Sequence, residues 1–214
     1  MTSSALPAAT DTPGADAPAP ARKRPKPGER KVQILQTLAA MLESPGSERI
    51  TTAALAARLE VSEAALYRHF ASKAQMYEGL IDFIDASLFT LINHITATDH
   101  PPAQQVRHIV GVVLQFAERN PGMTRVMVGD ALVFEHERLV QRMALWFDRL
   151  ESQLRQLLRA QAEAEGQAAA TVWAQARASL LVALVAGRLQ RFARSGFKRL
   201  PTEHLEASLD WLAH

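Results

Sequence analysis

The sequence predicts an all-α protein, and three observations support this fold class. From Glu29 onward, apolar residues recur at steps of three and four, the spacing that places them on one face of a helix. No stretch alternates between apolar and polar residues at a period of two between hairpin turns, as half-buried strands do. Proline and glycine interrupt the periodic segments, for example at SPG (44–46) and NPG (120–122), where helices would end.

Composition limits the classes of protein to consider. The chain has 214 residues, enough for one or two domains with a hydrophobic core. Because it contains no cysteine, a disulfide framework, a cysteine-ligated zinc site and a thiol nucleophile are excluded. Hydrophobic residues make up 48% of the chain, but none of their runs approaches the ~20 residues that cross a membrane. With no secretory signal either, we expect a cytoplasmic protein without a membrane span.

Residues 1–28 form a predicted disordered tail. They are rich in alanine, proline, serine and threonine, and such a segment buries too little apolar surface to offset the entropy of ordering it. At its end, ARKRPKPGERK (21–31) holds six cations and one acid, although the net charge of the whole chain is only +2. This basic segment indicates a polyanionic partner; a solvated tail that aids solubility is the alternative.

Four helices are predicted at the start of the ordered chain, over residues 30–44, 51–59, 62–70 and 72–95. One face of the first carries Val32, Leu35, Leu38, Ala39 and Leu42. Thr51 or Thr52 is placed to cap the free amides of the second helix. Ser72 and Gln75 have the spacing of a capping box at the start of the fourth.

The later helices are predicted at about 103–119, in shorter pieces within 122–134, and at about 135–164, 170–195 and 202–213. The segment 135–164 has a clear period, with apolar residues at Leu139, Met143, Trp146, Leu150, Leu154 and Leu157. We therefore predict a small domain at 29–75 and a larger helical domain at 76–214.

The second and third helices predict a helix-turn-helix unit. They are short and are joined at EVS (60–62), which lets the second of them stand across the first. The side chains that would close the core between them are Ala56, Leu59, Val61, Leu66 and Phe70.

The residue types along 62–70 favour a role in binding DNA. Small residues at the front let the helix approach base edges, and Ser62 with the free amides can receive a phosphate at the positive end of the helix dipole. At the back, Tyr67, Arg68 and His69 can reach the flanking backbone. Glu63 either accepts a hydrogen bond from a cytosine amino group or stabilises the helix N-terminus. A plain three-helix core, with Tyr67 as a packing residue, is the alternative.

Residues 50–81, ITTAALAARLEVSEAALYRHFASKAQMYEGLI, resemble the DNA-binding region of the TetR family of bacterial regulators. The signature of that family includes Tyr-x-His-Phe followed by a lysine at the start of the fourth helix, here Tyr67, His69, Phe70 and Lys73. The resemblance implies a TetR-like fold and DNA binding. The candidate DNA-binding residues are Thr51, Thr52, Ser62, Glu63, Ala64, Ala65, Tyr67, Arg68, His69 and Lys73.

Further segments resemble a narrower group within that family, the nucleoid occlusion factors of proteobacteria. They include ERNPGMTR (118–125), LESQLRQLLR (150–159) and RFARSGFKRLPT (191–202). This resemblance implies a nucleoid-associated homodimer that binds palindromic chromosomal sites and, when bound to DNA, disrupts assembly of the division protein FtsZ. The alternative is a TetR-type repressor released by a small inducer, which a sizeable closed cavity lined by polar and aromatic residues within 103–195 would favour.

A stripe of mostly small residues within 170–195 predicts a helix-pairing surface. Ala176, Leu180, Ala183 and Gly187 recur at steps of four, three and four, so another helix can approach closely. TetR-like proteins pair their last long helices with those of a second copy, and we therefore assign these residues, with Trp211, to a dimer interface. Packing within the protomer is the alternative. In a dimer the two reading heads would lie about one DNA turn apart, ~34 Å.

Two residues are candidates for contact with FtsZ. On the fourth helix, Leu80, Ile84, Leu88 and Leu91 define the inward direction, and Phe83 falls at the edge of that arc. Arg119 ends the fifth helix. A flexible FtsZ tail with acidic and apolar residues could lie in a groove between these helices; alternatively, Phe83 is core and Arg119 is solvated. Leu91 departs from the pattern of nucleoid occlusion factors, which have a basic residue there.

No motif indicates an enzyme, a cofactor or a metal site. The chain has no G-x-x-x-x-G-K-[ST] loop and no G-x-G-x-x-G. FEHERL (134–139) places an acid, a histidine and an acid in sequence, but neighbouring residues point in different directions around a helix. The histidines are scattered, and none forms an H-E-x-x-H pair.

Overall fold

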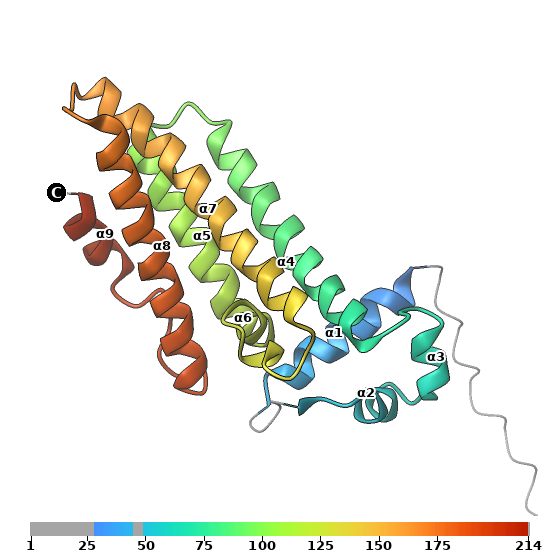
Figure 1. The fold of residues 1–214 in the computed structure, drawn as a ribbon. Helices are drawn as coiled ribbons and strands as arrows, with labels where there is room; N and C mark the ends of the chain where they lie inside the picture. The colour runs from blue at the N-terminus through green and yellow to red at the C-terminus, as the bar shows by residue number, and fades with distance from the viewer. Residues whose placement is uncertain (1–27, 45–48, 214) are drawn as a thin grey trace, which may run out of the picture.

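Helices account for all the regular secondary structure in the part of the chain that the computed structural model describes, residues 28–44 and 49–213. This confirms the predicted all-α class. The predicted tail lies outside the described residues, apart from Gly28. In chain order (Figure 1), the helices are α1 (Glu29–Leu42), α2 (Thr52–Arg58), α3 (Glu63–Tyr67), α4 (Lys73–Thr96), α5 (Pro102–Arg119), α6 (Pro121–Met127), η2 (Asp130–Leu132), α7 (Glu137–Ala164), α8 (Ala170–Arg194) and α9 (Leu205–Ala213).

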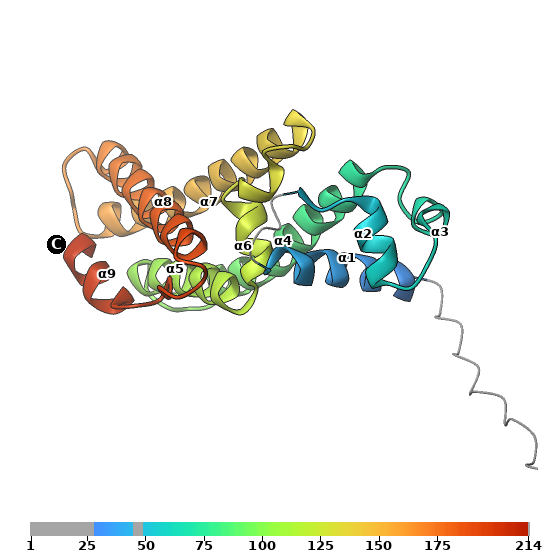
Figure 2. The same ribbon diagram turned by 90° about the horizontal axis from the view of Figure 1, so that it is seen from below.

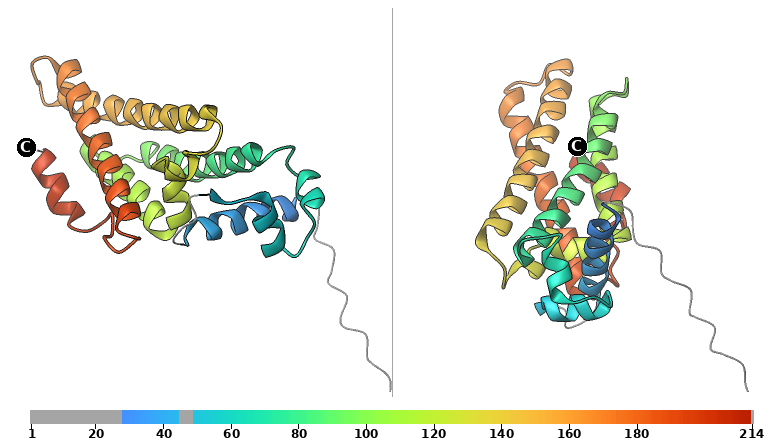
Figure 3. Two further views of the ribbon diagram at one scale, coloured as in Figure 1. Left: turned by 60° about the horizontal axis from the view of Figure 1, so that its bottom comes forward. Right: turned by 90° about the vertical axis from the view of Figure 1, so that its right-hand side faces the viewer.

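The long helices form an elongated body with a small helical domain at one end. Helices α4, α5, α7 and α8 lie alongside one another, and α1 to α3 surround the N-terminal end of α4 (Figures 1 and 3). Helix α9 lies beside α8, at the side of the body away from the small domain (Figure 2). The arrangement places α2 and α3 at the free end of the molecule.

Hydroxyl caps begin the three helices after α1. The Thr51 Oγ1 accepts a hydrogen bond from the Ala54 amide at 3.1 Å, so Thr51 is the cap of α2. Ser62 and Ser72 cap α3 and α4 in the same way. The Gln75 side chain accepts from the Ala71 amide at 2.9 Å, one residue before the amide that a capping box uses. Each cap typically stabilises its helix by about 1 kcal/mol relative to alanine.

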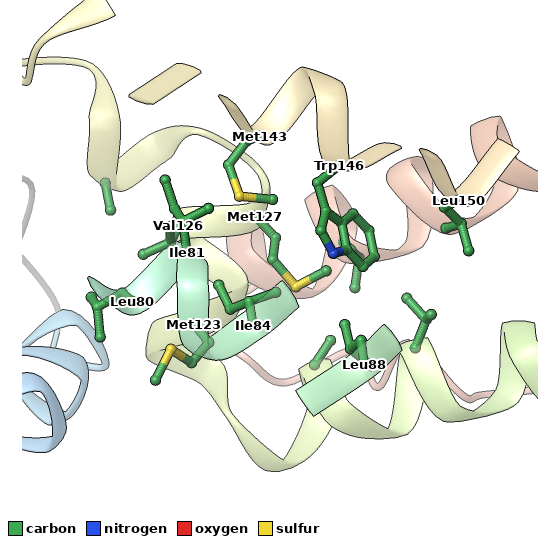
Figure 4. Packing of buried hydrophobic residues seen from close by; sticks show 14 of the residues in the cluster. Leu80, Ile81, Ile84, Leu88, Met123, Val126, Met127, Met143, Trp146 and Leu150 are labelled. Atoms are coloured by element: carbon green, nitrogen blue, oxygen red, sulfur yellow. The ribbon is translucent and has the colours of Figure 1, made fainter. Parts of the chain in front are cut away.

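The core of the body joins α4, α6 and α7 (Figure 4). Leu80, Ile84 and Leu88 of α4 face Met123 and Met127 of α6 and Met143, Trp146 and Leu150 of α7. Burying each such side chain stabilises the fold by roughly 1.5–3 kcal/mol. The prediction that Leu91 points inward is wrong, because Leu91 is 45% exposed and Ile92, four residues after Leu88, is buried instead.

Helix α1 buries most of the predicted face, since Leu38 and Leu42 are buried and Leu35 and Ala39 are half-buried against the core. Its buried residues are Ile34, Leu38 and Leu42, at steps of four. Val32 was predicted on this face, but it is 53% exposed. Two steps of 100° place Val32 on the far side of the helix from Ile34.

A glycine sets the contact between the small domain and the body. A Cβ on Gly122 in α6 would lie 2.0 Å from the Ala39 carbonyl oxygen of α1, a distance no side chain tolerates. Helices α1 and α6 therefore touch through their backbones. This contact explains why glycine follows proline in NPG (120–122).

A row of ion pairs joins α4 to the α7 region. Along the two helices, which run in the same direction, Lys73 pairs with Glu135, Glu78 with Arg138, Asp82 with Arg142 and Asp85 with Arg149. The last three are substantially exposed, so each contributes only about 0–1 kcal/mol. Their spacing fixes the register of α7 along α4.

Helix α8 is long and apolar enough to cross a membrane by length and composition, and among the described residues it alone is so. It packs along α7 through a buried edge that includes Ala174, Ala178, Leu181, Val185 and Leu189. A core helix of a soluble protein can pass the same test of length and composition.

Candidate nucleic-acid interface

The turn between α2 and α3 has the geometry of a Schellman motif. Glu60 takes the left-handed conformation with φ 55°. Its amide donates to the Ala57 carbonyl at 3.1 Å, and the Val61 amide donates to the Ala56 carbonyl at 3.0 Å. These bonds end α2 and direct the chain into α3. The sequence did not indicate this conformation, since glycine, not glutamate, usually occupies it.

The predicted core of the helix-turn-helix is confirmed. Ala56, Leu59, Leu66 and Phe70 are buried, and Val61 is half-buried against them. The third helix is shorter than predicted, because it ends at Tyr67 and the residues Arg68 and His69 continue it as a turn. Leu66 is the buried residue of α3.

The remaining side chains of α3 form a surface open to solvent. Ser62, Glu63, Ala64, Tyr67 and Arg68 are exposed, while Ala65 and His69 are half-buried. Figures 1 and 2 show α3 at the outer edge of the small domain, with the body of long helices behind it. The alternative in which Tyr67 is a packing residue is wrong, because 45% of Tyr67 is exposed.

A hydrogen-bonded cluster links the starts of α2 and α3. The Thr52 hydroxyl donates to the Glu63 carboxylate at 2.6 Å, and the Tyr67 hydroxyl lies 3.5 Å from the Thr52 oxygen. The Glu63 carboxylate is therefore held by a neighbouring helix. No sequence signal identified this pair, since Thr52 and Glu63 begin two different helices and their contact depends on how those helices cross.

Lys73 differs from the other candidate DNA-binding residues in its surroundings. Its ammonium pairs with Glu135, which precedes α7, and lies 5.7 Å from the centre of the Tyr77 ring. Burial raises the pKa of the Tyr77 hydroxyl above its usual range, and the negative charge of Glu135 raises this pKa further. Lys73 thus ties the start of α4 to the body.

The start of α1 brings positive charge next to this surface. The Lys31 ammonium lies 5.7 Å from the centre of the Phe70 ring. Arg30 and Lys31 are the cations within the described part of the basic segment 21–31, which also holds the acid Glu29. The rest of that segment, from residue 21 to residue 27, lies outside the described residues.

Two protein-family models match the chain, one near its N-terminal end and one over its C-terminal half. Residues 34–80 match the family described as bacterial regulatory proteins, tetR family. Residues 103–214 match the SlmA-like family described as tetracyclin repressor-like, C-terminal domain.

Curated relatives extend this result over most of the chain. The nucleoid occlusion factor SlmA of Idiomarina loihiensis is 52% identical over 178 residues, which are 83% of this chain and 90% of the relative. The SlmA of Cronobacter sakazakii is 50% identical, over 90% of this chain and 98% of the relative. The chain belongs to the SlmA family.

Solved structures support the TetR-like fold. The MbdR regulator from Azoarcus sp. CIB superposes with a TM-score of 0.70 at 16% identity, over 85% of this chain and 96% of that one. A TetR-like regulator from Rhodococcus sp. RHA1 gives a TM-score of 0.67 at 19% identity, over 89% of this chain and 98% of that one. The predicted fold is confirmed.

The stripe assigned to a dimer interface is open to solvent in the protomer. Ala176, Leu180, Ala183 and Gly187 are all exposed, and a Cβ on Gly187 would meet no atom within 4 Å. Trp211 of α9 is 86% exposed. Packing of this stripe within the protomer, the alternative reading of the sequence, is therefore wrong.

The two residues assigned to FtsZ binding also lie at the surface. Phe83 is 49% exposed and Arg119 is exposed. Phe83 shares α4 with Leu91, eight residues later, so the two exposed apolar side chains lie on the same side of that helix. Neither Phe83 nor Arg119 has the surroundings of a core residue.

A cavity of about 100 Å³ lies between α5, α7, α8 and α9. Its lining residues are Ala103, Val106, Arg107, Leu158, Gln161, Arg177, Leu180, Leu181 and Leu209. The lining has no aromatic side chain, and the volume is well below the roughly 300–1,000 Å³ of small-molecule sites. This cavity does not match the one that an inducer-controlled repressor would need. Among the described residues, no group of three His, Asp or Glu side chains could hold a metal.

Proposed function

We propose that the protein is a nucleoid occlusion factor: a homodimer that binds specific palindromic sites on the chromosome and, when bound, antagonises FtsZ assembly. The observation that carries this proposal is the identity of 50–52% to SlmA proteins over most of the chain. It extends over most of the chain, whereas the TetR-type structures with the same fold are only 16–19% identical over their aligned chains. Such a protein would work in the cytoplasm, on the nucleoid.

In this proposal α3 enters the major groove. Ser62, Ala64 and Ala65 lie nearest the base edges, because their small side chains allow close approach, and Glu63 beside them can accept a hydrogen bond from a cytosine amino group. Thr51 and Thr52 at the start of α2, with Tyr67, Arg68 and His69 at the end of α3, contact the phosphates on either side. Lys73 joins them only if its pair with Glu135 opens.

The FtsZ contact is placed on α4 and α5. Phe83 offers an exposed ring and Arg119 an exposed cation, which together suit a peptide with apolar and acidic residues. Helix α4 begins in the small domain at Lys73 and carries Phe83 along the same rigid rod. A shift of α4 on DNA binding would therefore move the FtsZ surface, which supports activation by DNA.

The experiment is sedimentation of FtsZ polymers with the protein, in the presence and absence of a duplex selected from a random pool. We expect less polymer in the pellet only when protein and selected duplex are both present. Phe83→Ala should restore the polymer and leave duplex binding unchanged. Val133→Ala, which removes an exposed apolar side chain from the segment before α7, is the control and should behave as the wild type.

Unchanged FtsZ polymer under every condition, with intact binding to the selected duplex, would remove the division role. The protein would then be treated as a TetR-type transcriptional repressor. That outcome would leave the proposed DNA interface in place.

A further inference from the structure

A second basic surface lies far from α3 in the sequence, where α8 ends. Arg191, Arg194, Lys198 and Arg199 are all exposed, and within the described part of the chain none of them forms an ion pair. The acid nearest in the chain, Glu203, lines a hollow with Lys198 and Arg199. Four cations against one carboxylate leave a strongly positive patch, which we call the α8 basic patch.

The backbone beneath this patch is ordered by specific hydrogen bonds. The Ser195 hydroxyl oxygen accepts from the amides of Lys198 at 3.1 Å and Arg199 at 2.9 Å. On the other side of the loop, the buried Arg188 donates to the carbonyls of Pro201 at 2.8 Å and Glu203 at 2.6 Å. Burial and the neighbouring charge of Arg191 lower the pKa of Arg188. The patch is therefore a fixed surface and not a loose tail.

The lining of the patch favours a phosphate backbone over a peptide. A hollow of about 420 Å³ is lined by Gly187, Gln190, Arg191, Arg194, Ser195 and Arg199. Three of these six residues, Arg191, Arg194 and Arg199, carry guanidinium groups. The large apolar side chain beside them is Leu200, which lines the neighbouring hollow with Lys198 and Arg199. The density of cations is what favours phosphates, which bind through cations and hydrogen-bond donors, over a peptide anchored on Leu200.

The position of the patch favours DNA in particular. The C-terminal end of α8 and the helices α2 and α3 lie toward the same lower end of the molecule (Figures 1 and 3). Gly187, which lines the hollow, also belongs to the stripe assigned to the dimer interface. In a dimer the two copies of the patch would therefore flank the two-fold axis, midway between the two recognition helices.

We propose that the α8 basic patch contacts the phosphates at the centre of the palindrome, between the half-sites read by the two α3 helices. This inference rests on the DNA-binding part of the proposed function. It assigns to the larger domain a direct share in binding DNA, through contacts that carry no base information. The negative charges of these phosphates would also reduce the repulsion between the two positive patches across the dimer axis.

The test compares the salt dependence of binding for the wild type and for the double variant Arg194→Gln/Arg199→Gln. The probe is a duplex selected from a random pool. Each lost phosphate contact lowers the slope of log affinity against log salt by ~0.9, so a dimer that loses four contacts would lose up to ~3.6. The control, Arg155→Gln/Arg159→Gln, removes the same charge near the C-terminal end of α7, outside the α8 basic patch. It should leave the slope close to that of the wild type.

A second measurement locates the contact. Methylphosphonates at the central phosphates of the duplex should weaken binding of the wild type but not of Arg194→Gln/Arg199→Gln. An unchanged slope in this double variant, with intact binding to the selected duplex, would overturn the inference alone. A second result would also overturn it: the wild type binds a glutamate-rich peptide, the double variant does not, and the salt slope for DNA is the same in both. The patch would then be assigned to an acidic protein. If selection with the wild type enriches no duplex from the random pool, both the inference and the proposed function are overturned.

Discussion

Tyr67 is the residue whose exposed hydroxyl defines the edge of the candidate DNA interface. Its oxygen lies 3.5 Å from the Thr52 oxygen, which is a long and weak hydrogen bond. The hydroxyl is therefore available to a phosphate at little cost. The shorter bond in the cluster, from Thr52 to Glu63, is complete without it.

We expect Tyr67→Phe to weaken DNA binding by about 1 kcal/mol for each protomer, because one hydrogen bond to the backbone is lost. The loss should be similar for selected and scrambled duplexes, since a phosphate contact carries no base information. Fluorescence anisotropy with both duplexes measures it. Tyr77→Phe is the matched control: this other tyrosine is buried at the start of α4 and should not change affinity. A loss confined to one base position would show that Tyr67 reads a base.

For single residues of the candidate site, the sequence predicted which side chains are exposed, but it did not predict their hydrogen-bond partners. The pattern placed Ser62, Tyr67 and Arg68 on the outer face, and they are exposed. It left open whether Glu63 faces a base or stabilises the helix N-terminus; the structure places Glu63 in the first turn of α3 and adds a bond from Thr52 that the sequence did not indicate. That contact depends on how α2 and α3 cross, which no local pattern encodes.

At the scale of elements, periodicity predicted where the helices lie, but it assigned some of their residues to the wrong side of the helix. The buried steps of four in α1 and α4 follow from the sequence, but Val32 and Leu91 were assigned to the wrong side. Periodicity alone could not exclude Leu91, because eleven residues complete about three turns and return it to the side of Leu80; the contacts with neighbouring helices decide its burial. The close approach of α1 and α6 could not be predicted either, since a glycine after a proline usually marks only the end of a helix.

The backbone contact between α1 and α6 leads to a prediction about Gly122. Gly122→Ala should destabilise the protein by about 3 kcal/mol, because the new Cβ would collide with the Ala39 carbonyl and force the helices apart. Urea unfolding measures the change. Gly111→Ala in α5 is the matched control: its Cβ would meet no atom within 4 Å, and better helix propensity should stabilise the protein by about 1 kcal/mol. Equal effects of the two substitutions would contradict the close approach.

For the molecule as a whole, the outer surface of α8 is the feature that a single protomer leaves unexplained. Val172, Leu180 and Trp211 expose large apolar side chains on α8 and α9. Gly187 weakens the helix by about 1 kcal/mol relative to alanine without any close neighbour in the protomer. A second copy would cover this surface and would make use of the missing side chain.

The same surface explains why α8 has the length and composition of a membrane-spanning helix. Apolar residues occur on its buried edge, against α7, and again on its free face. Two apolar faces on one helix are expected when one packs within the protomer and the other against a partner. Pairing of two copies thus accounts for the composition of α8 without a membrane.

We therefore expect Leu180→Glu to convert the dimer into a monomer. Leu180 is 56% exposed in the middle of the stripe, and two carboxylates facing each other across a two-fold axis would lose their hydration and repel. Sedimentation equilibrium measures the mass. The control is Leu91→Glu, which adds the same charge at a residue 45% exposed on α4, away from the stripe, and should remain a dimer.

Loss of the dimer should also change how DNA is bound. A monomer has one recognition helix, so Leu180→Glu should bind the palindrome no better than a duplex with one half-site, whereas Leu91→Glu should still prefer the palindrome. Far-ultraviolet circular dichroism checks the fold of both variants. Their helix content should equal that of the wild type, because a charge at the surface leaves the core in place. A Leu180→Glu protein that stays dimeric and keeps its preference for the palindrome would show that the two copies meet through another surface. The α8 basic patch would then lie away from the two-fold axis.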